Sequence, residues 1–320
     1  MPGVVLQPLN LGELLDRMFS IYRKNFLLFF GIMLLPSILA MISGILLAAF
    51  RAPIFLPKPG TTAIGAGAAG AAVGGFVIVG LAYWIVYAVA LGATTFAVGD
   101  VYLARTATIA ASYRRIRTRI GRLLWLMFLV AVRVFGVIVL VMIAFAVMIP
   151  LAMGRGAAGG ITVALTMIVL LPAAFVLSIW LMIRYSISIP SMVLEDVRAG
   201  QAIRRSVQLM RSNYLRCFLI LLLTSIIAYV SLMIFQGPFY IALLLSLRHG
   251  EVPIWLLSLN SVFGALGQAL SAPLIMIGLV LLYYDIRVRK EAFDLQMMMS
   301  LVDPAGAQSA SGAAAPVPNA

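Results

Sequence analysis

The sequence predicts an all-α membrane protein, a polytopic bundle of about six transmembrane helices. Of its 320 residues, 63% are hydrophobic and only 10% are charged. The mean hydropathy of +1.11 lies far above that of soluble domains, which could not bury so much apolar surface. The chain also contains repeated apolar stretches of about 20 residues or more, the length that a helix needs to cross a hydrocarbon layer of about 30 Å.

The apolar stretches define six predicted spans. They cover residues 27–50, 75–98, 123–149, 161–183, 217–235 and 255–284. A Gly- and Ala-rich stretch, residues 63–75, precedes the second span. It either extends that span outward or forms a flexible loop, because its small residues suit close helix packing as well as a loop.

Basic residues lie mostly on one side of these spans. Eighteen of the 23 Lys and Arg fall in the N-terminal segment, in the loops after the second and fourth spans, or just after the last span. Short cytoplasmic loops keep such residues, so we predict that these segments and both chain ends are cytoplasmic. The net charge of +13 then reflects topology and attraction to anionic lipid, and we expect no nucleic-acid partner.

Both ends of the chain have a characteristic composition. The first 24 residues carry charges of both signs, and the following apolar run exceeds the core of a signal peptide, which predicts an uncleaved anchor. Residues 297–320 are low in complexity, and we predict a disordered cytoplasmic tail. The one cysteine, Cys217, excludes an intramolecular disulfide and a multi-cysteine metal site.

The integral membrane domain, residues 1–296, is predicted to contain three degenerate repeats, 9–100, 104–196 and 198–296. Each unit holds a basic amphipathic helix, a span, a short outer loop and a second span. The first and third units align at a constant offset, for example Gly12 with Gly200, whereas the middle unit is a degenerate copy. Asn10 and Glu13 have the spacing of a capping box that begins the first amphipathic helix.

An apolar stripe with helical spacing marks each amphipathic helix. The stripes are Leu15, Phe19, Tyr22 and Phe26 in the first unit, Ile109, Tyr113, Ile116 and Ile120 in the second, and Ile203, Val207, Met210 and Tyr214 in the third. A helix with such a stripe and a basic opposite face lies in the membrane interface rather than across it. We therefore expect three interfacial helices.

The arginines on these helices are candidate binding residues for anionic phospholipid headgroups, since each basic residue near an anionic surface contributes about 1 kcal/mol. The candidates are Arg17, Arg23, Arg114, Arg115, Arg204, Arg205 and Arg211. The alternative is that these residues only anchor and orient the bundle.

Polar residues inside the spans form a second group. Arg133 lies within the third span, where a charge is costly and usually functional, unless its side chain snorkels to the cytoplasmic interface. Seven uncharged residues are expected to be hydrogen-bond partners between helices rather than to line a substrate path. They are Thr94, Thr95, Thr166, Ser178, Thr224, Ser225 and Gln268.

Three segments, 9–26, 189–218 and 281–296, carry a resemblance to a known family. They are similar to the membrane domain found ahead of the catalytic domain in some bacterial glycerophosphoryl diester phosphodiesterases, a domain that also occurs alone. The resemblance implies a bacterial inner membrane and, by analogy of fold, a link to glycerophospholipid metabolism. In the two-domain proteins the activity resides in a separate soluble barrel, so the resemblance supplies no catalytic residue here.

We expect no enzymatic activity, no metal and no cofactor. Phosphodiester hydrolysis by a barrel of that family needs histidine and metal-binding carboxylates. The one histidine of this chain, His249, lies in a short outer loop. The carboxylates near the span ends lie among arginines, which favours ion pairs over metal ligands.

Two functional hypotheses remain. The first is a non-catalytic scaffold that binds anionic lipid and positions unidentified membrane or cytoplasmic partners. The alternative is a transporter or permease for lipid or glycerophosphodiester-type solutes, suggested by six spans, repeats and prolines inside the spans. The sequence predicts no oligomeric state.

Overall fold

The computed structural model describes residues 9–55, 66–153, 156–248 and 253–291. Within these ranges the chain forms ten α-helices and no strand, which confirms the all-α class. The helices are α1 (Leu11–Lys24), α2 (Phe26–Phe55), α3 (Ala66–Tyr102), α4 (Ile109–Arg117), α5 (Ile120–Met153), α6 (Gly156–Tyr185), α7 (Ser188–Glu195), α8 (Ala199–Met210), α9 (Tyr214–Arg248) and α10 (Ile254–Glu291).

Six of these helices, α2, α3, α5, α6, α9 and α10, are long and apolar enough to cross a membrane, as the sequence predicts. Each begins before the predicted span, by one residue at α2 and α10 and by nine residues at α3. The helix α3 begins at Ala66, so the Gly- and Ala-rich stretch from that residue onward belongs to the same helix as the second span.

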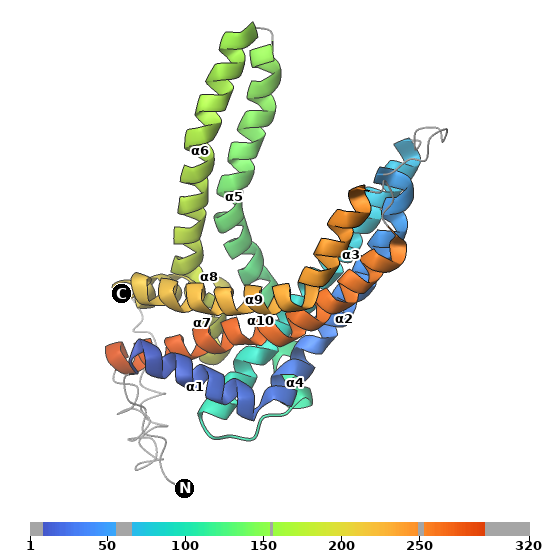
Figure 1. Ribbon diagram of the computed structural model, residues 1–320. Helices are drawn as coiled ribbons and strands as arrows, with labels where there is room; N and C mark the ends of the chain where they lie inside the picture. Colours follow the sequence, from blue (N-terminus) through green and yellow to red (C-terminus); the bar gives the residue numbers. More distant parts are fainter. Residues whose placement is uncertain (1–8, 56–65, 154–155, 249–252, 292–320) are drawn as a thin grey trace, which may run out of the picture.

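The long helices form two arms (Figure 1). The hairpin of α5 and α6 stands apart, while α2, α3, α9 and α10 pack into the second arm. The short helices α1, α4, α7 and α8 lie where the arms meet. We call this region the basic end: it comprises the four short helices, the starts of α2, α5 and α9, and the ends of α3, α6 and α10.

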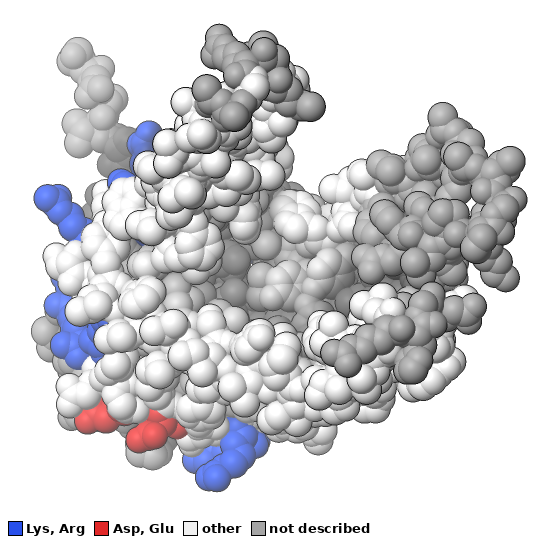
Figure 2. All heavy atoms as spheres, turned by 45° about the horizontal axis from the view of Figure 1, so that its top comes forward, with Lys and Arg blue, Asp and Glu red and all other residues white. Residues whose placement is uncertain are grey.

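The helix α10 forms the core of the second arm. In the most apolar 18-residue stretch of α10, 78% of the residues are buried, whereas in the corresponding stretch of α6 in the hairpin only 6% are buried. Tyr283 and Ile277 of α10 are fully buried, because α2, α9 and α1 pack around it. The apolar sides of the hairpin remain exposed, and a hollow separates the arms in Figure 2. Such a helix pair is stable where hydrocarbon surrounds it.

Helix starts recur at one offset between the first and third units. The helices α1, α2 and α3 begin at residues 11, 26 and 66, and α8, α9 and α10 begin at 199, 214 and 254, which is 188 residues later in each case. Gly12 and Gly200 show the same offset in the sequence. The middle unit keeps the order of a short helix and two long ones but not this offset, and it ends with an additional short helix, α7.

The predicted capping box begins α1. The Asn10 backbone N–H donates to Glu13 Oε2 at 2.7 Å. Leu14, Met18 and Ile21 form the face that packs against the bundle. The predicted stripe lies beside this face, and its residues Phe19 and Phe26 are 41% and 37% exposed. The helix therefore has a protein-facing side and an adjacent aromatic side that is open, as an interfacial position requires.

The stripe on α8 has a different environment. Ile203 and Met210 are buried in the main hydrophobic cluster, together with Leu209 and Ala202, rather than left open to lipid. The amphipathic pattern is present as predicted, but protein covers its apolar side. Hydrophobic periodicity does not distinguish these two environments, because lipid and a protein core favour the same residues.

Tyr113 connects the helix α4 to α2. Its hydroxyl donates to the Ile32 carbonyl at 2.6 Å. Burial raises the pKa of Tyr113 to about 12, so the hydroxyl keeps its proton at any physiological pH. Thr108 begins α4 as its N-cap by accepting from the Ala111 N–H. These contacts hold the arginine-rich face of α4 at the basic end.

Candidate functional site at the basic end

Asp285 is the most buried carboxylate at the basic end. Its side chain is 0% exposed and pairs with Arg216 of α9 at 2.9 Å and Arg289 of α10 at 3.1 Å. Its other oxygen accepts from the Leu9 backbone N–H at 2.7 Å. Both arginines also donate to the Leu9 carbonyl. This cluster therefore joins α9, α10 and the residue that leads into α1.

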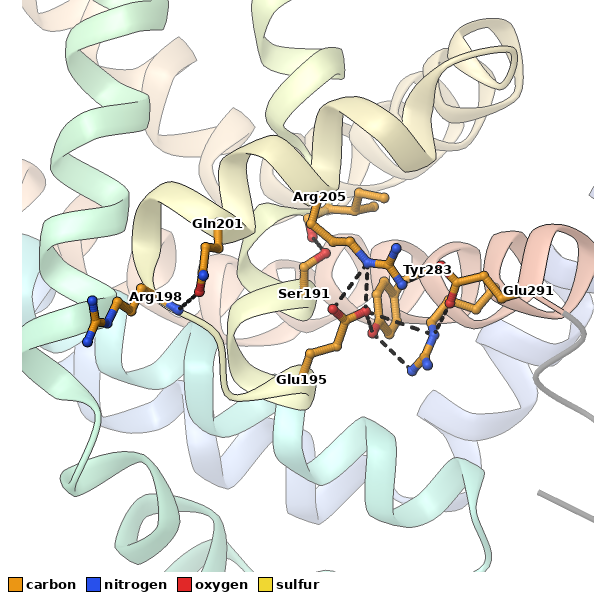
Figure 3. Close-up of polar contacts among 9 residues, drawn as sticks. Ser191, Glu195, Arg198, Gln201, Arg205, Tyr283 and Glu291 are labelled. Carbon is orange, nitrogen blue, oxygen red and sulfur yellow. Dashed lines mark hydrogen bonds and ion pairs between the residues drawn. The ribbon is translucent and has the colours of Figure 1, made fainter. Parts of the chain in front are cut away.

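Glu195 lies at the centre of a second cluster (Figure 3). Both of its carboxylate oxygens lie 3.2 Å from Nε of Arg205 on α8, and it accepts a 2.6 Å hydrogen bond from the Tyr283 hydroxyl. The Arg205 guanidinium also pairs with Glu291 of α10. Arg287 pairs with Glu291 at 3.0 Å and donates to the Tyr283 hydroxyl. Three helices, α7, α8 and α10, thus meet through alternating charges.

The environment of Arg205 favours its charged form. Burial of the guanidinium works against the charge, but the nearby Glu195 and Glu291 carboxylates outweigh it, and the pKa of Arg205 is raised above its ordinary value. Its side chain is 29% exposed. We interpret Arg205 as a residue that joins helices, although its sequence context is that of a lipid-facing arginine.

Asp196 joins the end of α7 to the start of α5. It has a left-handed backbone conformation, with φ of 54°, which ends the helix directly after Glu195. Its carboxylate pairs with Arg119 at 3.0 Å and Arg122 at 3.1 Å. Arg119 also donates to the Val193 carbonyl at 2.7 Å and so satisfies a group at the C-terminus of α7. The turn after Glu195 therefore fixes where that carboxylate points.

Arg115 is the second candidate that has a carboxylate partner. It pairs with Asp100 at 2.6 Å, and its guanidinium lies 4.5 Å from the centre of the Phe96 ring. Both partners belong to α3, so Arg115 holds α4 against the end of that helix. Arg115 therefore joins two helices, as Arg205 does.

The other five candidates, Arg17, Arg23, Arg114, Arg204 and Arg211, are exposed. None forms an ion pair with a carboxylate in the described ranges. Arg17 lies over the Tyr102 ring, 5.1 Å from its centre. Blue Lys and Arg side chains gather along the left and lower borders of the view in Figure 2, and uncharged residues cover most of the rest of the described surface. The seven candidate arginines therefore divide into two that pair with carboxylates and five that pair with no described carboxylate.

Arg133 is exposed on α5. Its Nη1 donates to the Leu129 carbonyl at 3.1 Å, one turn nearer the basic end. A side chain directed toward the nearer interface is the geometry of snorkelling.

We expect Arg133→Leu to accumulate in membranes at the level of the unchanged protein and to unfold at the same or a higher temperature, because a snorkelling arginine adds an insertion cost without a protein partner. Membrane fractionation and thermal unfolding measure this. Arg133→Lys, which also snorkels, is the control. Loss of lipid flux in proteoliposomes on Arg133→Leu would contradict this account and favour the transporter hypothesis.

The described residues contain no group of three or more His, Cys, Asp or Glu side chains that could hold a metal ion. His249 lies outside the described residues. The carboxylates Glu195, Asp196, Asp285 and Glu291 all pair with arginines, as their sequence context predicts.

Comparison with known proteins identifies a membrane module. Residues 160–302 match the family model for the membrane domain of glycerophosphoryl diester phosphodiesterase. This match confirms the resemblance for almost all of α6 and for α7 to α10, including both ion-pair clusters around Glu195 and Asp285. Neither a curated protein nor a solved structure matches the chain. Together with six candidate spans, the match establishes a multi-pass membrane protein.

Proposed function

We propose that this multi-pass protein is a non-catalytic membrane scaffold of the bacterial inner membrane, which binds anionic phospholipids at a cytoplasmic basic end. Its paired arginines hold the helices together, and its unpaired arginines contact lipid phosphates. The match to a phosphodiesterase membrane domain supports a link to glycerophospholipid metabolism.

One observation carries this proposal. Asp100, Glu195, Asp196, Asp285 and Glu291 are all neutralised by arginines, yet further arginines on the short helices remain exposed. These short helices lie directly beside the span ends, where headgroups surround a bundle. Positive charge without a protein partner at that level is complementary to an anionic membrane surface.

The test is native mass spectrometry of the protein extracted gently from membranes, with co-purifying phosphatidylglycerol and cardiolipin quantified. We expect the triple variant Arg114→Gln, Arg204→Gln and Arg211→Gln to lose anionic lipid about 100-fold, since three charges contribute about 3 kcal/mol in total. The expected loss is electrostatic, so lysine at the same three positions should preserve retention.

Equal retention by the glutamine variant and the unchanged protein would overturn the proposal, and those arginines would then act only in topology. A loss in both the glutamine and lysine variants would point to guanidinium geometry rather than to charge. That result would also contradict the electrostatic account.

A further inference from the structure

A groove of ≈ 610 Å³ runs along α1. Its described lining residues are Asp16, Phe19, Ser20, Tyr22, Arg23 and Phe26. The described lining comes from one face of α1 and from the first residue of α2, so the groove is open to its surroundings. The lining contains both charge signs and three aromatic rings, so its chemistry differs from that of a purely basic surface.

The polar side of the groove carries an unpaired carboxylate and an unpaired guanidinium. Asp16 and Arg23 are both exposed, and neither side chain contacts an opposite charge among the described residues. They lie two helical turns apart on one face, about 10 Å along the axis, with the Ser20 hydroxyl between them. A ligand that bridges them must carry a cation and an anion a short distance apart.

The aromatic side of the groove adjoins the start of the α2 span. Phe26 is the first residue of α2, where the apolar span begins. Tyr22 is fixed by a 2.7 Å hydrogen bond from its hydroxyl to the Leu270 carbonyl and by edge contact with the Phe26 ring at 5.6 Å. Exposed Phe19 and Phe26 thus offer apolar surface beside the charged pair. An amphipathic ligand satisfies both sides at once, and aromatic rings also attract an ammonium group.

We propose that this groove binds the headgroup of a zwitterionic phospholipid, a phosphodiester that carries a primary ammonium. Asp16 accepts hydrogen bonds from the ammonium, Arg23 donates to the phosphate, and the acyl chains lie along Phe19 and Phe26. This inference rests on the proposed function only for the membrane location, since it invokes a different lipid class.

The repeat provides an internal comparison. At the offset of 188 residues, Arg204 occupies the position of Asp16, and Arg211 occupies the position of Arg23. The third unit thus presents two cations where the first presents a carboxylate and a cation. The two copies are therefore suited to different headgroups, anionic on α8 and zwitterionic on α1.

Competitive native mass spectrometry tests this difference. The protein is reconstituted with equal amounts of phosphatidylethanolamine and phosphatidylglycerol of distinct acyl masses, and the ratio of the retained lipids is measured. We expect Asp16→Asn and Arg23→Gln each to lower retained phosphatidylethanolamine about tenfold. In Asp16→Asn the retained phosphatidylglycerol should not fall. The matched control Arg211→Gln should lower phosphatidylglycerol and leave phosphatidylethanolamine unchanged.

Two further arms complete the test. Exchanging the charges, with Asp16→Arg and Arg23→Asp together, should restore phosphatidylethanolamine relative to Asp16→Arg alone. Excess soluble glycerophosphoethanolamine distinguishes two forms of the ligand. Displacement of the lipid would show that the free headgroup also binds, and no displacement would show that the site requires acyl chains. Both results agree with recognition of the headgroup by Asp16 and Arg23. An unchanged lipid ratio in both Asp16→Asn and Arg23→Gln would overturn the site. That failure is distinct from unchanged phosphatidylglycerol in the triple glutamine variant, which would overturn the proposed function.

Discussion

Asp285→Asn should destabilise the protein by about 3–5 kcal/mol, because it removes the carboxylate that compensates the Arg216 guanidinium inside the helix junction. Arg216 is only 19% exposed, and its Nε already has no hydrogen-bond partner in the described structure. The Leu9 N–H would keep only a weaker amide acceptor. The junction of α9, α10 and the start of α1 should therefore open at a lower temperature.

The chain contains a natural reporter for this measurement. Cys217, the one cysteine of the sequence, is 0% exposed, so a thiol-reactive dye reports its exposure on heating. The control is Arg289→Gln, which removes a 38% exposed partner of the same carboxylate and should cost about 1 kcal/mol or less. Asp285→Asn with an unchanged unfolding temperature would show that this ion pair contributes nothing to the junction.

Arg205→Gln should destabilise the protein by about 1.5–3 kcal/mol, whereas the same change at the adjacent Arg204 should alter stability by less than about 0.5 kcal/mol. Arg205 joins Glu195 of α7 to Glu291 of α10, while Arg204 is exposed and makes no ion pair with a described carboxylate. Dye labelling of Cys217 on heating again provides the measurement.

A double-mutant cycle attributes the effect to the ion pair. Glu195→Gln combined with Arg205→Gln should destabilise less than the sum of the two single changes, because each removes the same interaction. Strict additivity, or equal stability of the Arg204 and Arg205 variants, would argue against a joining role for Arg205.

The sequence predicted the spans and the start of α1 because these features depend on local composition and spacing. Asn10 and Glu13 lie within one helical turn, so their capping box could be identified from the chain alone. It also predicted that the carboxylates near the span ends would pair with arginines. Which arginines pair could not be predicted, since Arg205 and Glu291 lie on different helices that meet only in the folded bundle.

Polar residues in the spans show the same limit. Ser178 donates to Val134 on α5, and Gln268 donates to Tyr83 on α3, as predicted for contacts between helices. Thr94, Thr95, Thr166 and Thr224 instead donate to carbonyls of their own helices, so that part of the prediction was wrong. A hydroxyl on Cβ reaches the carbonyl four residues earlier, and sequence spacing does not show which acceptor it chooses.

The groove on α1 was missed for a related reason. Asp16 and Arg23 are two turns apart in the sequence, and Phe19 and Phe26 were assigned to an interfacial stripe. Their combination into one groove required knowledge of which side of α1 packs against α10. The sequence signal that indicates the groove is the carboxylate of Asp16, which stands where the third unit has Arg204.

We propose that unpaired arginines at the basic end bind lipid, whereas paired arginines hold the fold. The amount of anionic lipid retained by Arg204→Gln and by Arg205→Gln, measured side by side at a temperature where both variants are folded, distinguishes these two roles. We predict that Arg204→Gln lowers retained lipid about fivefold, from the loss of about 1 kcal/mol, while Arg205→Gln leaves it unchanged. An equal loss in both variants, or a loss only in Arg205→Gln, would contradict the claim.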